Sequence, residues 1–353
     1  MASDRERSLT LVPFSEATKA EKLDSHTYRV NLYDAFCIGA VPNGGYTASC
    51  MLAAASVHLS PRGQPDTLTA HFEYPDRTAV GPAIVVVEDV KLTGQLSTLH
   101  LTLWQDGLLS QAPWVTPSVS RRVVLAYTTH TNLRTFAGIT LPTGYEATAA
   151  AALPPLPDFE ALKAKDGDDN WEEPKVPKSS KLVMRSLRNW HFYMPRQGPL
   201  TPGVLDMWIR MASGERITQR ALAYVVDSFP YNLHTFLAAP ELRALLQPPR
   251  DPEEEARTRE ARAEVASADE SRAGLWFPTV VMNLEAKTAL PEEGVEWLAV
   301  RVTSKQIKDG KFDLDVLVRD VEGEIVALSH HVAMILNIER NTKKRGSSTK
   351  AAL

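Results

Sequence analysis

The sequence has few cysteines and little net charge. Its 353 residues include only two cysteines, Cys37 and Cys50, and carry a formal net charge of −4. Disulfide-stapled secreted domains use more cysteines, so we expect the chain in a reducing compartment. Without a large basic excess there is no strong field to hold a phosphate backbone, so nucleic acid is not an expected partner.

Targeting signals and long apolar runs are also missing. Residues 1–7 are polar and charged with no apolar segment behind them, so no secretory signal is predicted. No run approaches the roughly 18 apolar residues that a membrane-spanning helix needs. The final residues, Ala351-Ala352-Leu353, lack the basic middle residue of the usual peroxisomal signal. A cytoplasmic location is therefore expected, with the peroxisome as the lesser alternative.

Several catalytic and binding motifs do not occur. The sequence has no Gly-x-Ser-x-Gly elbow, which disfavours an α/β-hydrolase, and no Gly-rich phosphate or dinucleotide loop. It also lacks the His-x-x-x-Asp motif of one class of CoA-dependent acyltransferases. Its histidines and cysteines do not have the spacing of a zinc site. We therefore expect neither a cofactor nor a metal.

Segments rich in proline or charge divide the chain. Residues 148–177 have the composition of a surface linker, and residues 248–272 that of an exposed charged helix or a disordered insert. The predicted organisation is an N-terminal domain (1–150), a linker (151–177), a C-terminal domain (178–340) containing the insert 248–272, and a flexible tail (341–353).

Each half contains one apolar helix and a run of strands. Helical spacing of apolar residues predicts a first helix over 44–59 that is buried nearly all round. A second helix is predicted over 217–229. Asp106-Gly107 predicts a hairpin turn leading into Leu108 and Leu109, and Glu322-Gly323 another turn. Strands are predicted over 68–74, 83–91, 97–105, 122–127, 204–211, 278–285, 296–304, 312–319 and 325–335.

An antiparallel sheet needs an apolar layer against one face, and each half offers a single buried helix for this purpose. A helix wrapped by a curled antiparallel sheet is the hotdog arrangement. Two such units could pair their sheets edge to edge and so hide exposed strand edges. The predicted fold is therefore α+β, a double hotdog.

Asp227 is the most conspicuous candidate for chemistry. It follows the apolar residues 222–226, and a carboxylate in such a helix loses solvation and must find partners. Beside a cleft it could hold or deprotonate a water. The alternative is a residue at the end of a helix that bonds local amides before Pro230, and the residues alone favour neither reading.

Other candidates are less distinctive by themselves. Thr279 could orient the same water, although threonine is common in strands. Strand alternation puts His330 and His331 on opposite faces, so one of them should point to the buried side. A lone histidine in a strand is more often a core residue than a catalyst.

The segment Asn43-Gly44-Gly45-Tyr46 opens the first helix. Its glycines would let a ligand approach the chain, and its free amides could attract an oxyanion; tight packing of the helix start against the sheet is the slightly favoured alternative. Aromatic side chains could line an acyl channel, although aromatics at such spacing are usually core. These are Tyr224, Trp208, Trp276, Phe229 and Trp104.

Four segments resemble thioesterase-like double-hotdog proteins related to bacterial acyl-CoA thioesterase II. Residues 42–46 are similar to that family's first helix start, and 222–227 to the second-half helix whose aspartate is catalytic. Residues 279–284 are similar to the strand with the catalytic threonine, and 326–331 to the last strand, which carries a catalytic glutamine. The resemblance covers roughly 14–335 without the connectors. In this sequence His331 stands where the glutamine would be.

The resemblance implies hydrolysis of an acyl thioester, linked to CoA or to a carrier protein, by water that Asp227 and Thr279 activate. His331 would help to place the water or the thioester, and helix-start amides would polarise the carbonyl. Asn43, Gly44, Gly45, Tyr46 and Tyr224 would bind substrate. A dehydratase or cyclase on the same fold, and a non-catalytic acyl-binding module, remain alternatives. A homodimer is a further expectation.

Overall fold

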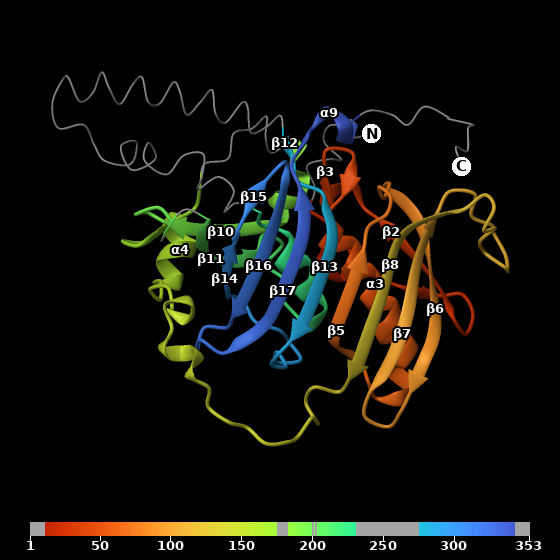
Figure 1. Ribbon diagram of the computed structural model, residues 1–353, viewed down its shortest axis with the longest axis horizontal. Helices are drawn as coiled ribbons and strands as arrows, with labels where there is room; N and C mark the ends of the chain where they lie inside the picture. Colours follow the sequence, from red (N-terminus) through yellow and green to blue (C-terminus); the bar gives the residue numbers. More distant parts are fainter. Residues whose placement is uncertain (1–10, 175–182, 200, 202, 231–274, 343–353) are drawn as a thin grey trace.

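The computed structural model describes residues 11–174, 183–199, 201, 203–230 and 275–342. Within these residues, 14 strands form one antiparallel sheet, and the long helix α3 (Gly44–Leu59) lies against it (Figure 1). The strand order is β1-β2-β6-β7-β8-β5-β13-β17-β16-β14-β11-β10-β9, with β15 paired to β16. In the described residues no helix is long and apolar enough to cross a membrane.

The first half contains the long helix and the orange strands of Figure 1. Its helices are α2 (Phe14–Ala17) and α3 (Gly44–Leu59). Its strands in the large sheet are β1 (Glu21–Lys22), β2 (Thr27–Leu32), β5 (Asp66–Glu73), β6 (Gly81–Leu92), β7 (Ser97–Gln105) and β8 (Arg121–Thr131). A small separate pair is formed by β3 (Cys37–Ile38) and β4 (Val41–Pro42). The predicted bounds of the first helix are confirmed.

The part of the second half that the structure describes is mostly strands. Its helices are α4 (Phe159–Lys165), α6 (Leu222–Asp227) and α9 (Glu339–Thr342). Its strands are β9 (Trp171–Glu172), β10 (Trp190–Pro195), β11 (Val204–Met211), β12 (Leu275–Trp276), β13 (Thr279–Ala286), β14 (Leu298–Thr303), β15 (Ile307–Lys308), β16 (Lys311–Arg319), β17 (Ile325–Met334) and β18 (Leu336–Asn337). The turn at Glu322-Gly323 is confirmed, with Gly323 at φ 89°.

Two local predictions are wrong. Asp106 and Gly107 do adopt positive φ, but β7 ends before them and β8 begins only at Arg121, so Leu108 and Leu109 lie in a loop. That loop is closed by its own bonds, including Leu109 N to Trp114 O at 2.8 Å. The helix predicted over 217–229 is also shorter, because the backbone of Ile217 pairs with that of Val295 at 2.7 and 2.9 Å.

The predicted surface linker contributes to packing. Leu162 on α4 and Trp171 on β9 are buried in a small apolar cluster with Tyr193, Trp208 and Trp297. Asn341, at the start of the predicted tail, is also buried and bonds the backbone of Ile38 and Ala40. The predicted insert at 248–272 and the end of the tail lie outside the described residues.

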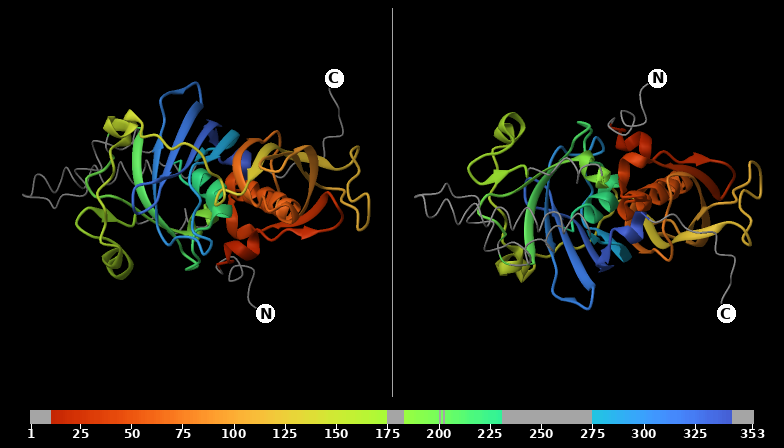
Figure 2. Two further views of the ribbon diagram at one scale, coloured as in Figure 1. Left: turned by 90° about the horizontal axis from the view of Figure 1, so that it is seen from below. Right: turned by 90° about the horizontal axis from the view of Figure 1, so that it is seen from above.

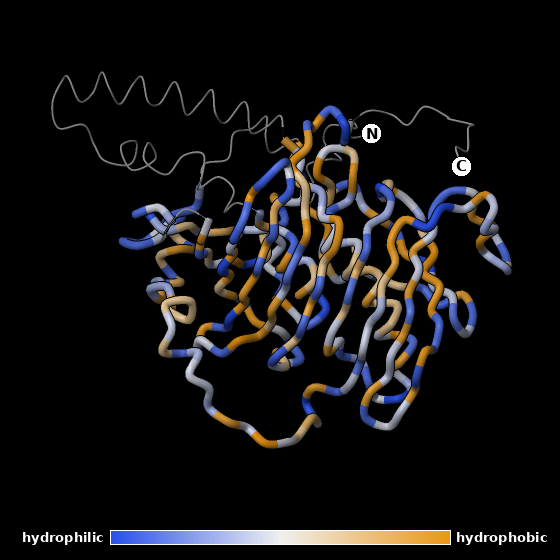
Figure 3. Tube along the Cα trace, in the orientation of Figure 1, coloured by the Kyte–Doolittle hydropathy of each residue, from blue (hydrophilic) through white to orange (hydrophobic). Residues whose placement is uncertain are grey.

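The two halves meet along one pair of strands. β5 and β13 are hydrogen-bonded neighbours, with Phe72 opposite Met282 and Glu73 opposite Val281. Behind this seam α3 and α6 lie side by side, inside the curve of the sheet (Figure 2). Hydrophobic and hydrophilic residues intermingle along many strands (Figure 3). The buried apolar residues of the strands form one cluster with those of α3 and α6. One continuous core therefore spans both halves.

Close packing of α3 against α6 depends on Gly45. A Cβ atom at this position would lie 2.2 Å from the carbonyl oxygen of Ala223 and 2.6 Å from Cβ of Asp227. The obstacle is backbone, so a side chain could be accommodated only if the helices moved apart.

We predict that Gly45→Ala lowers the free energy of unfolding by about 1–3 kcal/mol, because it overpacks the contact between the helices. Chemical denaturation measures this change. Gly94→Ala is the matched control, since a Cβ there meets open space, and its effect should stay within about 0.5 kcal/mol. Equal stabilities of the two variants would contradict the packing argument.

A second prediction concerns His130, a fully buried residue of β8 whose Nε2 contacts the Thr128 hydroxyl at 2.9 Å. Burial, followed by the charge of His58, lowers the pKa of His130 to about 3. In the unfolded chain a histidine titrates at pH ~6.5. Between pH ~3 and ~6.5 the unfolded state therefore binds a proton at His130 that the folded state does not bind. The contribution of His130 to the free energy of unfolding is therefore fully present above pH ~6.5. It is lost as the pH falls below that value, by up to about 1.4 kcal/mol per pH unit.

Because glutamine cannot take up this proton, His130→Gln should lose less stability than the wild type between pH ~6.5 and ~4. Urea denaturation at a series of pH values measures the difference. His100→Gln, on the neighbouring strand and paired with Glu88 at 3.3 Å, should keep the wild-type acid slope. An unchanged slope in the His130 variant would refute the assignment.

Candidate functional site

Asp227 is the last residue of α6 and contacts the first turn of α3. Its Oδ2 accepts a hydrogen bond from the backbone N–H of Gly45 at 2.7 Å. Asn43 caps α3 by accepting from the Tyr46 N–H at 2.9 Å, and its amide nitrogen donates to the Asp227 carbonyl at 3.1 Å. A carboxylate is stabilised at a helix N-terminus, where the amides are unsatisfied and the dipole is positive. Residues of the first half therefore hold the Asp227 carboxylate, which belongs to the second half.

The other carboxylate oxygen faces two residues from the sheet. The hydroxyl of Thr279 donates to Asp227 Oδ1 at 2.8 Å, and His331 Nδ1 lies 3.4 Å from the same oxygen. The side chains of Asp227 and His331 are only 7% and 1% exposed. The structure thus brings together Asp227, Thr279 and His331, which the sequence singled out from separate segments.

Strand geometry places the two sheet residues. The pairing of β13 with β17 shifts register between Thr279 and Val281, and such an irregularity can redirect a side chain. On β17, His331 points to the buried side, whereas His330 is exposed and contacts Asp315 at 2.7 Å. The predicted opposite orientation of the two histidines is confirmed.

The hydrogen bonds around His331 define its tautomer. The hydroxyl of Ser329 donates to the carbonyl of Asn283, so it can only accept from His331 Nε2 at 2.7 Å. Nε2 must then carry a hydrogen. In the neutral ring Nδ1 is an acceptor, and this is the buried atom that points at Asp227 with no hydrogen bond among the described residues. His331 Nδ1 and the Asp227 carboxylate are then two buried hydrogen-bond acceptors side by side, and they need a hydrogen-bond donor that can contact them.

Gly44 leaves space beside the acid. A Cβ atom on Gly44 would lie 3.0 Å from Asp227 Oδ2 and 3.3 Å from the Tyr74 ring. Tyr74 was not singled out from the sequence; its hydroxyl donates to the Gly44 carbonyl at 3.0 Å. Burial, followed by the charge of Asp227, raises the pKa of Tyr74 well above its ordinary value, so the phenol stays protonated. A tyrosine just after a strand carries no local signal for this role.

The expected substrate-binding residues separate into two groups. Tyr46 and Tyr224 lie in the core, where the Tyr46 hydroxyl donates to Ala17 O at 2.9 Å and the Tyr224 hydroxyl to Ser186 O at 2.8 Å. Burial is the main cause that raises the pKa of both phenols. Both were expected to bind substrate, with Tyr224 also a candidate for lining an acyl channel; in this structure both rings are enclosed by aromatic neighbours. Asn43, Gly44 and Gly45 remain at the acid.

The amide of Gly45 also differs from its expected use. The helix-start amides in general were expected to polarise a substrate carbonyl, and this one donates to Asp227. Of the other aromatic residues, Trp208, Phe229 and Trp104 are buried in the core, as the commoner behaviour of aromatics predicts, and Trp276 is half-buried on β12.

Comparisons with known proteins agree over both halves. Residues 32–130 match the family model of the acyl-CoA thioesterase N-terminal domain, and residues 157–335 that of the C-terminal domain. The thioesterase-like protein TwmA of Talaromyces wortmannii is 71% identical over 342 residues, which cover 96% of this chain and 97% of that protein.

Solved structures share the fold at low identity. A hot dog fold protein from Alicyclobacillus acidocaldarius has a TM-score of 0.62 at 17% identity, covering 93% of this chain and 99% of that one. Acyl-CoA thioesterase II TesB2 of Mycobacterium marinum has a TM-score of 0.58 at 15% identity, covering 92% and 98%. These matches show that the chain is a hotdog-fold member of the acyl-CoA thioesterase family.

Proposed function

We propose that the protein hydrolyses acyl thioesters of the acyl-CoA type with a water that Asp227 activates. The observation that carries this proposal is the buried carboxylate, which is held by the Gly45 amide and the Thr279 hydroxyl and faces the acceptor nitrogen of His331. A fixed, desolvated base in hydrogen-bond reach of one water is what general-base catalysis requires.

We further infer that the scaffold is a double hotdog. One unit comprises α3 with the sheet from β1 to β5, and the other comprises α6 with the sheet from β13 to β9. The shared strand pair, β5 and β13, joins the two sheets edge to edge. The proposed domains keep the bounds 1–150 and 178–340, and the linker 151–177 between them adds α4 and β9 to the second unit. In this arrangement Asp227 of the second unit contacts the first turn of α3 in the first unit.

The proposed step uses one water and one thioester. Asp227 and the bare Nδ1 of His331 accept the two hydrogens of the water, whose oxygen attacks the carbonyl carbon. The attack places negative charge on the carbonyl oxygen, and collapse of this intermediate breaks the C–S bond. The proton taken up by the base passes to the departing thiolate, so the products are a carboxylic acid and a free thiol.

Thr279 has a positioning role in this scheme. Its hydroxyl hydrogen is directed to Asp227 Oδ1, so it fixes the orientation of the carboxylate that accepts from the water. The amide of Gly44, in the first turn of α3, is the proposed donor to the carbonyl oxygen, since the Gly45 amide serves Asp227. The space that Gly44 leaves beside Asp227 supports this assignment.

Direct contact between Asp227 and His331 argues against a dehydratase. Such an enzyme needs its acid and base on two sides of a β-hydroxyacyl chain, whereas here the two groups are 3.4 Å apart. Substrate cannot pass between them. The acyl thioester is therefore the proposed partner, carried by CoA or by a carrier protein. Thiol release measured with both carriers distinguishes these sources, and an assay for water loss tests the rival reaction.

Replacing Asp227 with Asn keeps the shape of the side chain but removes the base. We predict that Asp227→Asn lowers kcat for thiol release by about 10²–10⁴-fold, the usual contribution of a general base. Asp309→Asn, at an exposed turn position, is the control and should keep wild-type turnover. Thermal unfolding should show a folded chain in both. Wild-type turnover by Asp227→Asn would sink the mechanism.

His331 is tested by an amide and an apolar replacement. Because a glutamine side chain can accept a hydrogen bond from the water, His331→Gln should keep kcat/KM within about 10-fold, whereas His331→Leu should lose about 10²-fold or more. His330→Gln, on the exposed face, should leave kcat/KM unchanged. If His331→Leu hydrolyses thioesters as well as His331→Gln, the ring does not help to hold the water.

A further inference from the structure

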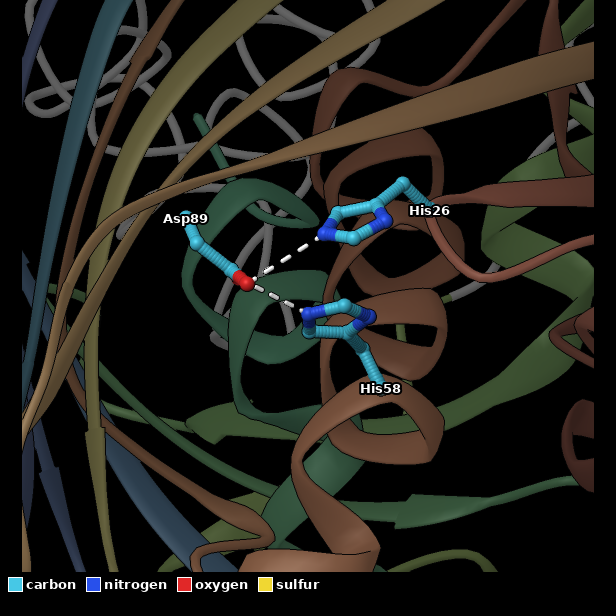
Figure 4. A group of neighbouring side chains, drawn as sticks. All are labelled: His26, His58 and Asp89. Atoms are coloured by element: carbon cyan, nitrogen blue, oxygen red, sulfur yellow. Dashed lines mark hydrogen bonds and ion pairs between the residues drawn. The ribbon is translucent and has the colours of Figure 1, made fainter.

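Two histidines and an aspartate converge at the other end of α3 (Figure 4). His26 Nε2 lies 3.2 Å from Asp89 Oδ2, and His58 Nε2 lies 2.8 Å from Asp89 Oδ1. One ligand atom from each residue falls within 4.8 Å of the others. His26 and Asp89 are 47% and 30% exposed, so ions can reach the group, whereas His58 is 10% exposed.

The fold fixes each of the three residues from a different element. His26 lies in the turn before β2, where its N–H bonds Asp24 Oδ1 at 2.9 Å and its carbonyl accepts from Val87 N at 2.8 Å. This second bond aligns His26 with β6, which carries Asp89. The pairing of β6 with β7 shifts register between Asp89 and Lys91. His58 is next to the last residue of α3.

The second nitrogen of each ring is held by a hydroxyl group. Tyr28 Oη lies 3.1 Å from His58 Nδ1, and Ser25 Oγ lies 2.9 Å from His26 Nδ1. Histidines that bind metals characteristically use their second nitrogen in this way, which fixes the ring orientation. Burial, aided by the charges of Asp24 and Asp89, raises the pKa of Tyr28 to about 12, so its hydroxyl stays neutral and can accept from a ring N–H.

We propose that His26, His58 and Asp89 form a binding site for a divalent transition-metal ion, with Zn²⁺ the best match. Two imidazoles and one carboxylate are a donor set typical of Zn²⁺, with water in the fourth position. Zn–N and Zn–O bonds of about 2.0–2.2 Å place neighbouring tetrahedral ligands roughly 3.4 Å apart. His26 Nε2 and His58 Nε2 lie 3.2 and 2.8 Å from the two different oxygens of Asp89, and the three ligand atoms fall within 4.8 Å of one another, so small side-chain rotations would bring them to this spacing.

Metal binding requires only a redistribution of hydrogens. In each neutral ring the single hydrogen moves, by exchange with solvent, from Nε2 to Nδ1; the bare Nε2 binds the ion and the Nδ1–H donates to Tyr28 or Ser25. The Asp89 carboxylate, which contacts both rings in this structure, supplies the third ligand. The sequence pattern did not predict this site, because its ligands are far apart along the chain.

The ion would connect the turn before β2, the end of α3 and strand β6. His58 is 13 residues from Gly45 along α3, about 20 Å at 1.5 Å per residue. The site is therefore separate from the proposed hydrolytic centre, and its role would be to tie the helix end to the sheet. Its test does not depend on thioesterase activity.

The test uses the full-length chain without a histidine tag, stripped with a chelator and titrated with ZnCl2 in a calorimeter. We expect one equivalent of tight binding, and a rise in Tm of at least about 3 °C at ~100-fold excess over Kd. Co²⁺ in place of Zn²⁺ should produce the visible absorption of a tetrahedral complex. His26→Ala and Asp89→Asn should each weaken binding by at least about 10-fold.

His100→Ala is the matched control. His100 also pairs with a carboxylate on β6, Glu88, at 3.3 Å, but among the described residues it belongs to no group of three possible metal ligands. This variant should bind Zn²⁺ as the wild type does. Absence of a stoichiometric binding event, or equal affinity in all four proteins, would overturn the proposal and identify the group as an ion-pair network only. Preserved folding of His26→Ala is checked by its far-UV spectrum, since the residue is exposed.

Discussion

The hydrogen bond from the Gly45 amide to the Asp227 carboxylate is the contact on which the proposed chemistry depends. A carboxylate this buried is costly unless it is hydrogen-bonded, and the first turn of α3 supplies an amide that no residue of its own helix can use. The bond forms only because Gly45 has no side chain, so that α6 can approach α3 closely. One small residue thus permits both the packing of the halves and the placement of the acid.

The seam between β5 and β13 completes the arrangement. Tyr74 follows β5 and bonds the backbone of both Val280 and Gly44, so it connects the start of β13 with the start of α3. Thr279 lies at that same strand start. Neither half alone contains every group around Asp227. Fusion of the halves in one chain therefore keeps the acid, its helix-start donor and the sheet residues in a fixed relation.

Helix α3 has a different task at each end. Its first turn, capped by Asn43, neutralises part of the charge of Asp227. Its last turn carries His58 to the surface, beside His26 and Asp89. A long buried helix without charged residues can fix two distant clusters at once, because the surrounding sheet prevents it from shifting along its axis. Buried His130 lies near the second cluster and responds to its charge.

The sequence by itself determined the elements and the residues with unusual surroundings. Apolar spacing and the cap at Asn43 defined α3, alternation predicted that one of His330 and His331 points inward, and a charge at the end of an apolar helix marked Asp227. Only the tertiary structure decided which side chains meet. The bond to Gly45, the role of Tyr74, the shortened α6 and the cluster at His58 all depend on strand register and helix packing. These are set by contacts between residues distant in sequence, which local patterns do not encode.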